Sequence, residues 1–135
     1  MKYPPITCQL LLDKNVSDNN IDEFRNLFGT NGMMRLDETT FIRYSKNFSW
    51  GYLGNCLLDE PDKKLFNEIT KHYWEKWYSL HIHLHDTYKA IFENIKKGGR
   101  PPTQQDFYDY ILPNNAAREK AYKEEALGFF YIYSR

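Results

Sequence analysis

Three histidines, His81, His83 and His85, occur at every second position of one short run, and Asp86 follows them. Imidazole nitrogens and carboxylates are ligands of zinc, so the run suggests a metal site that could activate a water molecule for hydrolysis. A β-strand would place all three histidines on one side, whereas an α-helix turns by about 100° per residue and separates them. The secondary structure of the run therefore decides which chemistry it can support.

The segment around the histidines is predicted to be one long helix over residues 62–97, because it contains no Gly or Pro. Asp59 and Pro61 are typical of a helix start, and Lys97 followed by Gly98 is typical of a helix end. Its apolar residues recur at spacings of three and four, which predicts one buried stripe. The stripe consists of Phe66, Ile69, Tyr73, Trp77, Leu80, Leu84, Tyr88, Ile91 and Ile95.

On a helix, His81 and His85 lie one turn apart on the same side, and His83 points to the opposite side. A three-histidine metal site is therefore excluded, and only the pair His81 and His85 remains. Zinc normally needs a third protein ligand, and the sequence identifies none. A metal-dependent hydrolase built on this pair is the third of three hypotheses for function, and no cofactor is predicted.

An aromatic strip shares the side of the helix on which His81 and His85 lie. It is formed by Trp74, Tyr78 and Phe92, beside the apolar stripe. We expect this strip either to be covered by the C-terminal helices or to bind a partner protein, because Trp, Tyr and His are frequent in protein interfaces. Trp50 and Tyr52, from the preceding region, are expected to add anchoring contacts.

The length of the predicted helix bears on the same question. At a rise of 1.5 Å per residue it would span about 54 Å, whereas a compact domain of this size is roughly 35–40 Å across. We expect the helix either to break near residues 79–85 or to project from the domain. A projecting end would be covered by a partner protein or by a second copy of the chain.

The first 58 residues predict a small antiparallel sheet. Residues 6–12 resemble a short buried strand, and residues 33–58 resemble two or three antiparallel strands. Gly51 and Gly54 in this region are expected to mark ordinary hairpin geometry, with a bulge or a close approach of another backbone as the alternative. The predicted fold is therefore α+β, with this short N-terminal sheet packed on a mainly helical C-terminal half. One domain is expected over residues 1–135, β-rich over residues 1–58 and helical over residues 59–135.

Helix signals also occur on both sides of this predicted sheet and long helix. Ser17 or Asp18 is expected to begin a short helix that Gly29 ends. Thr103 and Asp106 resemble a capping box that opens another short helix, which Pro113 would end. Asn114 or Asn115 would begin a final helix, and residues 128–133 could complete that helix or add a strand to the sheet.

The composition is that of a soluble globular protein, with 41% hydrophobic and 27% charged residues and equal numbers of basic and acidic side chains. Cys8 and Cys56 lie in apolar surroundings, and no signal peptide is recognised, which predicts buried free thiols in the cytoplasm. No apolar run is long enough to predict a membrane span. A Gly-rich phosphate loop, a nucleophile elbow and cysteines at zinc-finger spacing are all absent from the sequence.

The preferred hypothesis is a small cytoplasmic protein that binds another protein without catalysis. It would act as an inhibitor, an immunity-type protein or a small subunit of a complex, and a homodimer is an alternative assembly. Nucleic-acid binding is the second hypothesis, because basic residues could form a patch with nearby aromatic rings. These basic residues are Lys96, Lys97, Arg100, Arg118 and Lys123.

Overall fold

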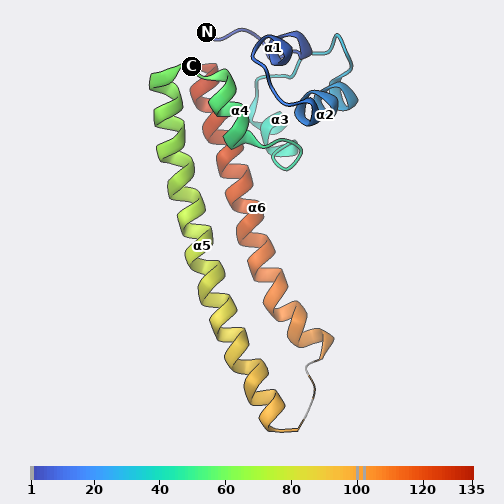
Figure 1. Cartoon of the computed structure of the whole chain (residues 1–135), viewed down its shortest axis with the longest axis vertical. Coiled ribbons are helices and arrows are strands. Elements are labelled where there is room, and N and C mark those ends of the chain that lie inside the picture. The colour runs from blue at the N-terminus through green and yellow to red at the C-terminus, as the bar shows by residue number, and fades with distance from the viewer. Residues whose placement is uncertain (1, 100, 102) are drawn as a thin grey trace. The chain divides into compact units, whose positions relative to one another are not determined.

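The computed structural model describes residues 2–99, 101 and 103–135. Within these ranges the chain forms six helices and no strand, so the prediction of an α+β fold with an N-terminal sheet is wrong and the fold is mainly helical (Figure 1). Two compact units are present. Unit 1 comprises residues 1–71 and 122–135, and unit 2, which we call the hairpin, comprises residues 72–121.

The predicted first strand is instead helix α1 (Cys8–Asp13). The Thr7 hydroxyl oxygen accepts a hydrogen bond of 3.2 Å from the backbone N–H of Leu10 and so caps the helix. Cys8 and Leu11, three positions apart, are buried, a spacing that suits one helical face. The apolar run from Ile6 was too short for its period to separate a helix from a strand.

Helix α2 (Asp18–Phe28) confirms the prediction for this segment. Ser17 is its N-cap residue, and Gly29 ends it with a φ of +81°. That left-handed conformation is readily available only to glycine. Ile21 and Phe24 form the buried face of the helix.

Helices α3 (Glu38–Arg43) and α4 (Trp50–Leu57) occupy the region predicted to be two or three strands. The Asp37 carboxylate accepts a 2.7 Å hydrogen bond from the Thr40 N–H and begins α3. Gly54 marks close helix packing and not a strand bulge, since a Cβ atom there would lie 2.1 Å from a ring carbon of Phe66. Alternation of apolar and polar residues over four or five positions is a weak indicator of a strand, and the helix-capping interactions outweighed it.

Helix α5 (Glu60–Lys97) is continuous, so the first of the two expected alternatives, a break near residues 79–85, is absent. Its start is the predicted one, with the Asp59 carboxylate accepting a 3.1 Å hydrogen bond from the Asp62 N–H. None of the helices in the described ranges has an apolar stretch long enough to cross a membrane.

Helix α6 (Gln104–Ser134) is also a single helix and contains Pro113. The Thr103 hydroxyl accepts from the Asp106 N–H at 3.2 Å, which confirms the predicted capping box. The predicted helix end at Pro113 and the predicted second start at Asn114 or Asn115 are both wrong. Residues 128–133 are helical, because Phe129, Ile132 and Tyr133 are buried at helical spacing while Tyr131 is exposed.

The core of unit 1 is built around Phe129 of α6, which is fully buried. Its ring centroid lies 5.2 Å from that of Trp50, 5.2 Å from that of Tyr133, 5.9 Å from that of Phe66 and 6.0 Å from that of Phe41. These four rings come from α4, α6, α5 and α3. Aromatic pairs of this kind contribute beyond the area that they bury, so Phe129 joins four helices of unit 1.

Candidate functional site

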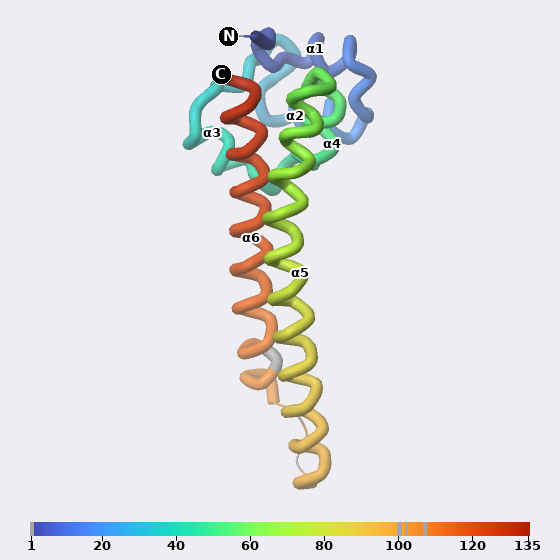
Figure 2. The backbone as a smooth tube through the Cα atoms, turned by 90° about the vertical axis from the view of Figure 1, so that its left-hand side faces the viewer, coloured from blue at the N-terminus to red at the C-terminus, as the bar shows by residue number. Residues whose placement is uncertain are grey.

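The hairpin consists of the later part of α5 and the earlier part of α6, which run side by side in opposite directions in both views (Figures 1 and 2). The side chains of α5 that are half-buried here are close to the predicted stripe but not identical to it. Leu80 and Ile91 are exposed, and His81 and Phe92 are half-buried in their place. The half-buried set is Tyr73, Trp74, Trp77, His81, Leu84, Tyr88, Phe92 and Ile95.

His81 is held by two neighbours. Its ring stacks on the indole of Trp77, with centroids 5.2 Å apart, and its Nδ1 lies 3.1 Å from the side-chain oxygen of Asn114 on α6. Trp74 packs edge-on against Trp77 at 5.5 Å. The contact between α5 and α6 within the hairpin, which we call the seam, is therefore formed largely by aromatic side chains. Its buried Trp77 indole N–H lacks a hydrogen-bond partner among the described residues.

His85 lies one turn further along α5 and is exposed. Its Nδ1 is 3.4 Å from the hydroxyl of Tyr110, and its ring is 6.4 Å from that of His81. The residues that the structure describes contain no group of three or more His, Cys, Asp or Glu that could hold a metal ion. Nδ1 of each imidazole contacts a residue of α6, so the pair forms a polar contact between the two helices, and a metal site at this pair stays a prediction.

Tyr88 connects the two helices at the proline of α6. Pro113 has no N–H, so the carbonyl four residues earlier, that of Asp109, loses its partner within the helix. The Tyr88 hydroxyl donates a hydrogen bond to this carbonyl. Hence α6 continues past a residue that normally ends a helix, and α5 supplies the missing donor.

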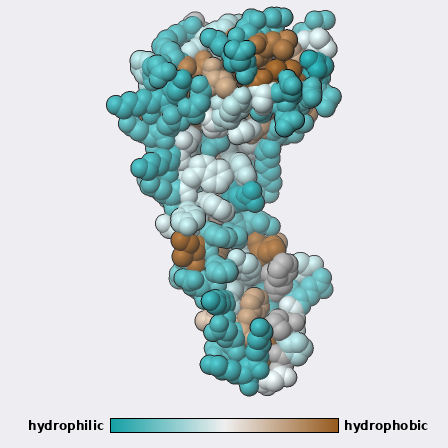
Figure 3. Space-filling model, viewed as in Figure 1, coloured by the Kyte–Doolittle hydropathy of each residue, from teal (hydrophilic) through white to brown (hydrophobic). Residues whose placement is uncertain are grey.

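The outer surface of the hairpin carries large apolar and aromatic side chains. Tyr78 is 58% exposed and Leu112 is 62% exposed, and Ile82 and Tyr108 are exposed as well. On the face that Figure 3 shows, hydrophobic residues appear as separate brown spots on a mostly hydrophilic surface. Among the hairpin residues whose side chains are described, Ala121 alone is buried. The hairpin is one layer of two helices without a closed core.

The other predicted contact residues, Trp50 and Tyr52, lie in unit 1. Trp50 is 1% exposed, and its indole N–H donates to the Tyr44 carbonyl at 3.3 Å. Tyr52 is partly exposed, and its hydroxyl accepts from the Ser17 N–H at 3.0 Å. Trp50 is a core residue, so we do not retain it as an anchor for a partner, and Tyr52 has a role in joining α4 to the start of α2.

The basic residues of the nucleic-acid hypothesis are divided between the units. Lys96, Lys97 and Arg118 belong to the hairpin, Lys123 belongs to unit 1, and Arg100 lies outside the described residues. Lys96 and Lys97 are exposed at the end of α5. These basic residues are thus distributed over both units and one position outside the described residues, and nucleic-acid binding stays a prediction.

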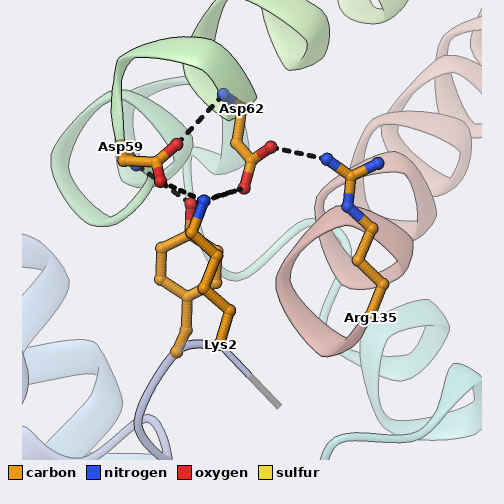
Figure 4. Close-up of polar contacts among 5 residues, drawn as sticks. Lys2, Asp59, Asp62 and Arg135 are labelled. Atoms are coloured by element: carbon orange, nitrogen blue, oxygen red, sulfur yellow. Dashed lines mark hydrogen bonds and ion pairs between the residues drawn. The ribbon is translucent and has the colours of Figure 1, made fainter.

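The densest polar cluster of unit 1 surrounds Asp62, whose side chain is 5% exposed (Figure 4). Its carboxylate accepts from the Tyr3 hydroxyl at 2.6 Å and pairs with Arg135 at 2.5 Å and with Lys2 at 3.4 Å. Lys2 also pairs with Asp59. The hydrogen bond from Tyr3, aided by Arg135 and Lys2, holds the pKa of Asp62 below its ordinary value. This cluster fastens both ends of the described chain to the start of α5, and its acids are paired.

Two further residues of the hairpin seam, Asn114 and Tyr110, were not predicted as contacts of the histidines. Asn114 was interpreted as a helix cap because it follows Pro113. The signal that could have found this contact is the 3.5-residue repeat of packed helix pairs. Applied to α5, this repeat places His81 on the inner face, where it meets a side chain of α6.

No family model, curated protein or solved structure matches this chain.

Proposed function

We propose that this protein acts by binding another protein through its hairpin, as an inhibitor, an immunity-type protein or a small subunit of a complex. The observation that supports the proposal is the contrast between the units. Unit 1 closes a core around Phe129, whereas the hairpin presents Tyr78 and Leu112 outward and has only Ala121 buried among its described side chains. A helix must bury its apolar face against another element to be stable in a domain.

A protein partner suits this surface better than a small substrate. The exposed apolar residues are distributed along the hairpin among charged ones, which resembles the mixture of anchors and polar rim in protein interfaces. The free thiols of Cys8 and Cys56 support a location in the cytoplasm.

The test is affinity capture from the native host with the full chain as bait, followed by mass spectrometry. A Tyr78→Ala, Leu112→Ala double variant should lose the captured partner, with retention falling by at least tenfold. Met33→Ala is the matched control, since Met33 lies in unit 1 and, like Tyr78, is 58% exposed. Circular dichroism and urea unfolding should show that each variant keeps its fold, because exposed substitutions usually change stability by no more than about 0.5 kcal/mol.

Three outcomes would contradict the proposal. The first is equal retention of every partner by the double variant and the wild type. The second is loss of the partner in the Met33 variant alone, which would move the interface to unit 1. The third is a stable homodimer by light scattering that the double variant dissolves, since the surface would then be occupied by a second copy of the chain.

A further inference from the structure

A pocket of about 320 Å³ opens on the hairpin, and His85 of the seam is one of its lining residues. Four rings line it, those of His85, Tyr88, Phe92 and Tyr110. The ring centroids of Tyr88 and Tyr110 are 5.2 Å apart, and those of Tyr88 and Phe92 are 6.2 Å apart. Ligand sites are concave and mainly apolar with a few polar groups, and volumes of roughly 300–1,000 Å³ are usual. The volume is suited to one aromatic side chain.

The polar ends of the two tyrosines are already engaged. The Tyr88 hydroxyl donates to the Asp109 carbonyl, and the Tyr110 hydroxyl lies 3.4 Å from Nδ1 of His85. The walls therefore offer ring faces and not hydroxyl groups. Aromatic rings favour offset or edge-on contacts with a further ring, so a ligand with a planar ring is favoured.

Three charged side chains of α5 complete the lining, Lys89, Glu93 and Lys96. They lie along one side of the helix in the order positive, negative, positive, with the two lysines about 10.5 Å apart along the axis at 1.5 Å per residue. None of the three has an ion-pair partner within the described part of the chain. The lysines are available to carboxylates of a ligand, and the Glu93 carboxylate can accept from an N–H or O–H donor.

We infer that this pocket receives a tyrosine side chain of the partner protein, from a segment in which acidic residues flank the tyrosine. The inference rests on the proposed function and specifies the chemistry of the partner. The tyrosine ring packs among Tyr88, Phe92 and Tyr110, and the flanking carboxylates pair with Lys89 and Lys96. An extended chain rises about 3.3 Å per residue, so acids on both sides of the tyrosine span the distance between the lysines. Glu93 disfavours a continuous phosphate backbone in the same place.

The test uses defined pentapeptides with capped ends and ¹⁵N-labelled full-length protein. The first peptide has a central tyrosine between two pairs of glutamates, the second replaces the tyrosine with alanine, and the third replaces the glutamates with lysines. The first should shift the amide resonances of Tyr88, Lys89, Phe92, Lys96 and Tyr110 in a saturable way. The alanine peptide should bind at least tenfold more weakly, and the lysine peptide should not bind.

Lysine variants then test whether the charges beside the pocket contribute to peptide binding. Lys89→Ala combined with Lys96→Ala should weaken the first peptide about five- to tenfold, the effect expected for two exposed ion pairs. Lys76→Ala is the matched control, because Lys76 is exposed on the same helix and does not line the pocket. The control should leave peptide binding unchanged.

Absence of saturable shifts with the first peptide would overturn the inference, as would equal binding of the alanine peptide. Tighter binding of a short thymidine oligonucleotide at the same resonances would overturn it in favour of nucleic acid. These results are separable from failure of the proposed function. Retention of the partner through Tyr78 and Leu112 without peptide binding would refute the pocket alone, and peptide binding without any captured partner would refute the proposed function alone.

Discussion

The hydrogen bond from Tyr88 to the Asp109 carbonyl can be tested through its link to Pro113. In the wild type, Tyr88→Phe removes the side-chain donor that the described structure provides for this carbonyl. In a Pro113→Ala background, the alanine N–H can bond the same carbonyl, since it lies four residues earlier in the helix. The cost of Tyr88→Phe should therefore be smaller in the second background.

The magnitude follows from the exposure of the two groups. A neutral hydrogen bond contributes about 0.5–1.5 kcal/mol net, and Asp109 is exposed while Tyr88 is half-buried, so water can replace part of the loss. We expect Tyr88→Phe to cost about 0.5–1 kcal/mol in the wild type and about 0.3 kcal/mol or less with Ala at 113, a coupling of about 0.5 kcal/mol. Pro113→Ala alone should stabilise the hairpin, because proline inside a helix is less favourable than alanine by about 3 kcal/mol.

The assay is native-state hydrogen exchange of hairpin amides in the four proteins of this double-mutant cycle, since it measures local opening free energies directly. Tyr78→Phe is the control for loss of a hydroxyl, because the Tyr78 hydroxyl has no partner among the described residues. An equal cost of Tyr88→Phe in both backgrounds would refute the reasoning. So would a Tyr78→Phe effect as large as that of Tyr88→Phe.

Three other predictions concern unit 1. Asp62→Asn should make the free energy of unfolding depend less on pH in the acid range. The lowered pKa of Asp62 stabilises the folded protein above the unfolded pKa of about 3.9, and this stabilisation is lost as pH falls through the folded pKa. Urea titrations from about pH 6 to about pH 3 would check this, and parallel curves for both proteins would contradict it. Gly54→Ala should destabilise by about 1–3 kcal/mol or more, because its Cβ would lie 2.1 Å from the Phe66 ring. Gly128→Ala should be neutral or stabilising by up to about 1 kcal/mol, since its Cβ would lie 3.4 Å from Ile69 and alanine favours the helix; urea midpoints in the opposite order would refute both.

The parts of the fold that could be predicted were those with a strong local signal. Asp59 and Lys97 bound a long periodic segment, and Gly29 needs a positive φ, so α5 and α2 were found from the sequence. The predictions for the short N-terminal segments were wrong, because the side chains of these segments are buried by contacts with residues distant in sequence. Phe41 and Trp50 look like strand residues in sequence, but they become helical when Asp37 caps α3 and when Phe129 offers them a common core.

The site was predicted in part for the same reason. The helical period correctly divided His83 from His81 and His85, and it selected the side of α5 on which the pair lies. It could not show that α6 continues through Pro113, because the donor that satisfies Asp109 comes from Tyr88, far away in sequence. Asp62 was missed because its partners, Lys2 and Arg135, lie near the two ends of the chain.

The division of unit 1 by the hairpin has a consequence for the order of folding. Residues 1–71 lack Phe129 and Tyr133, so their core cannot be completed until residues 122–135 arrive. Bringing the two pieces together closes a loop of about 50 residues, which carries an entropic penalty of about 3–4 kcal/mol plus a constant when the loop is a flexible chain. If α5 and α6 pair first, residues 71 and 122 are already neighbours and the penalty falls. We therefore expect changes that weaken the pairing of these helices, such as Tyr88→Phe, to slow the refolding of unit 1.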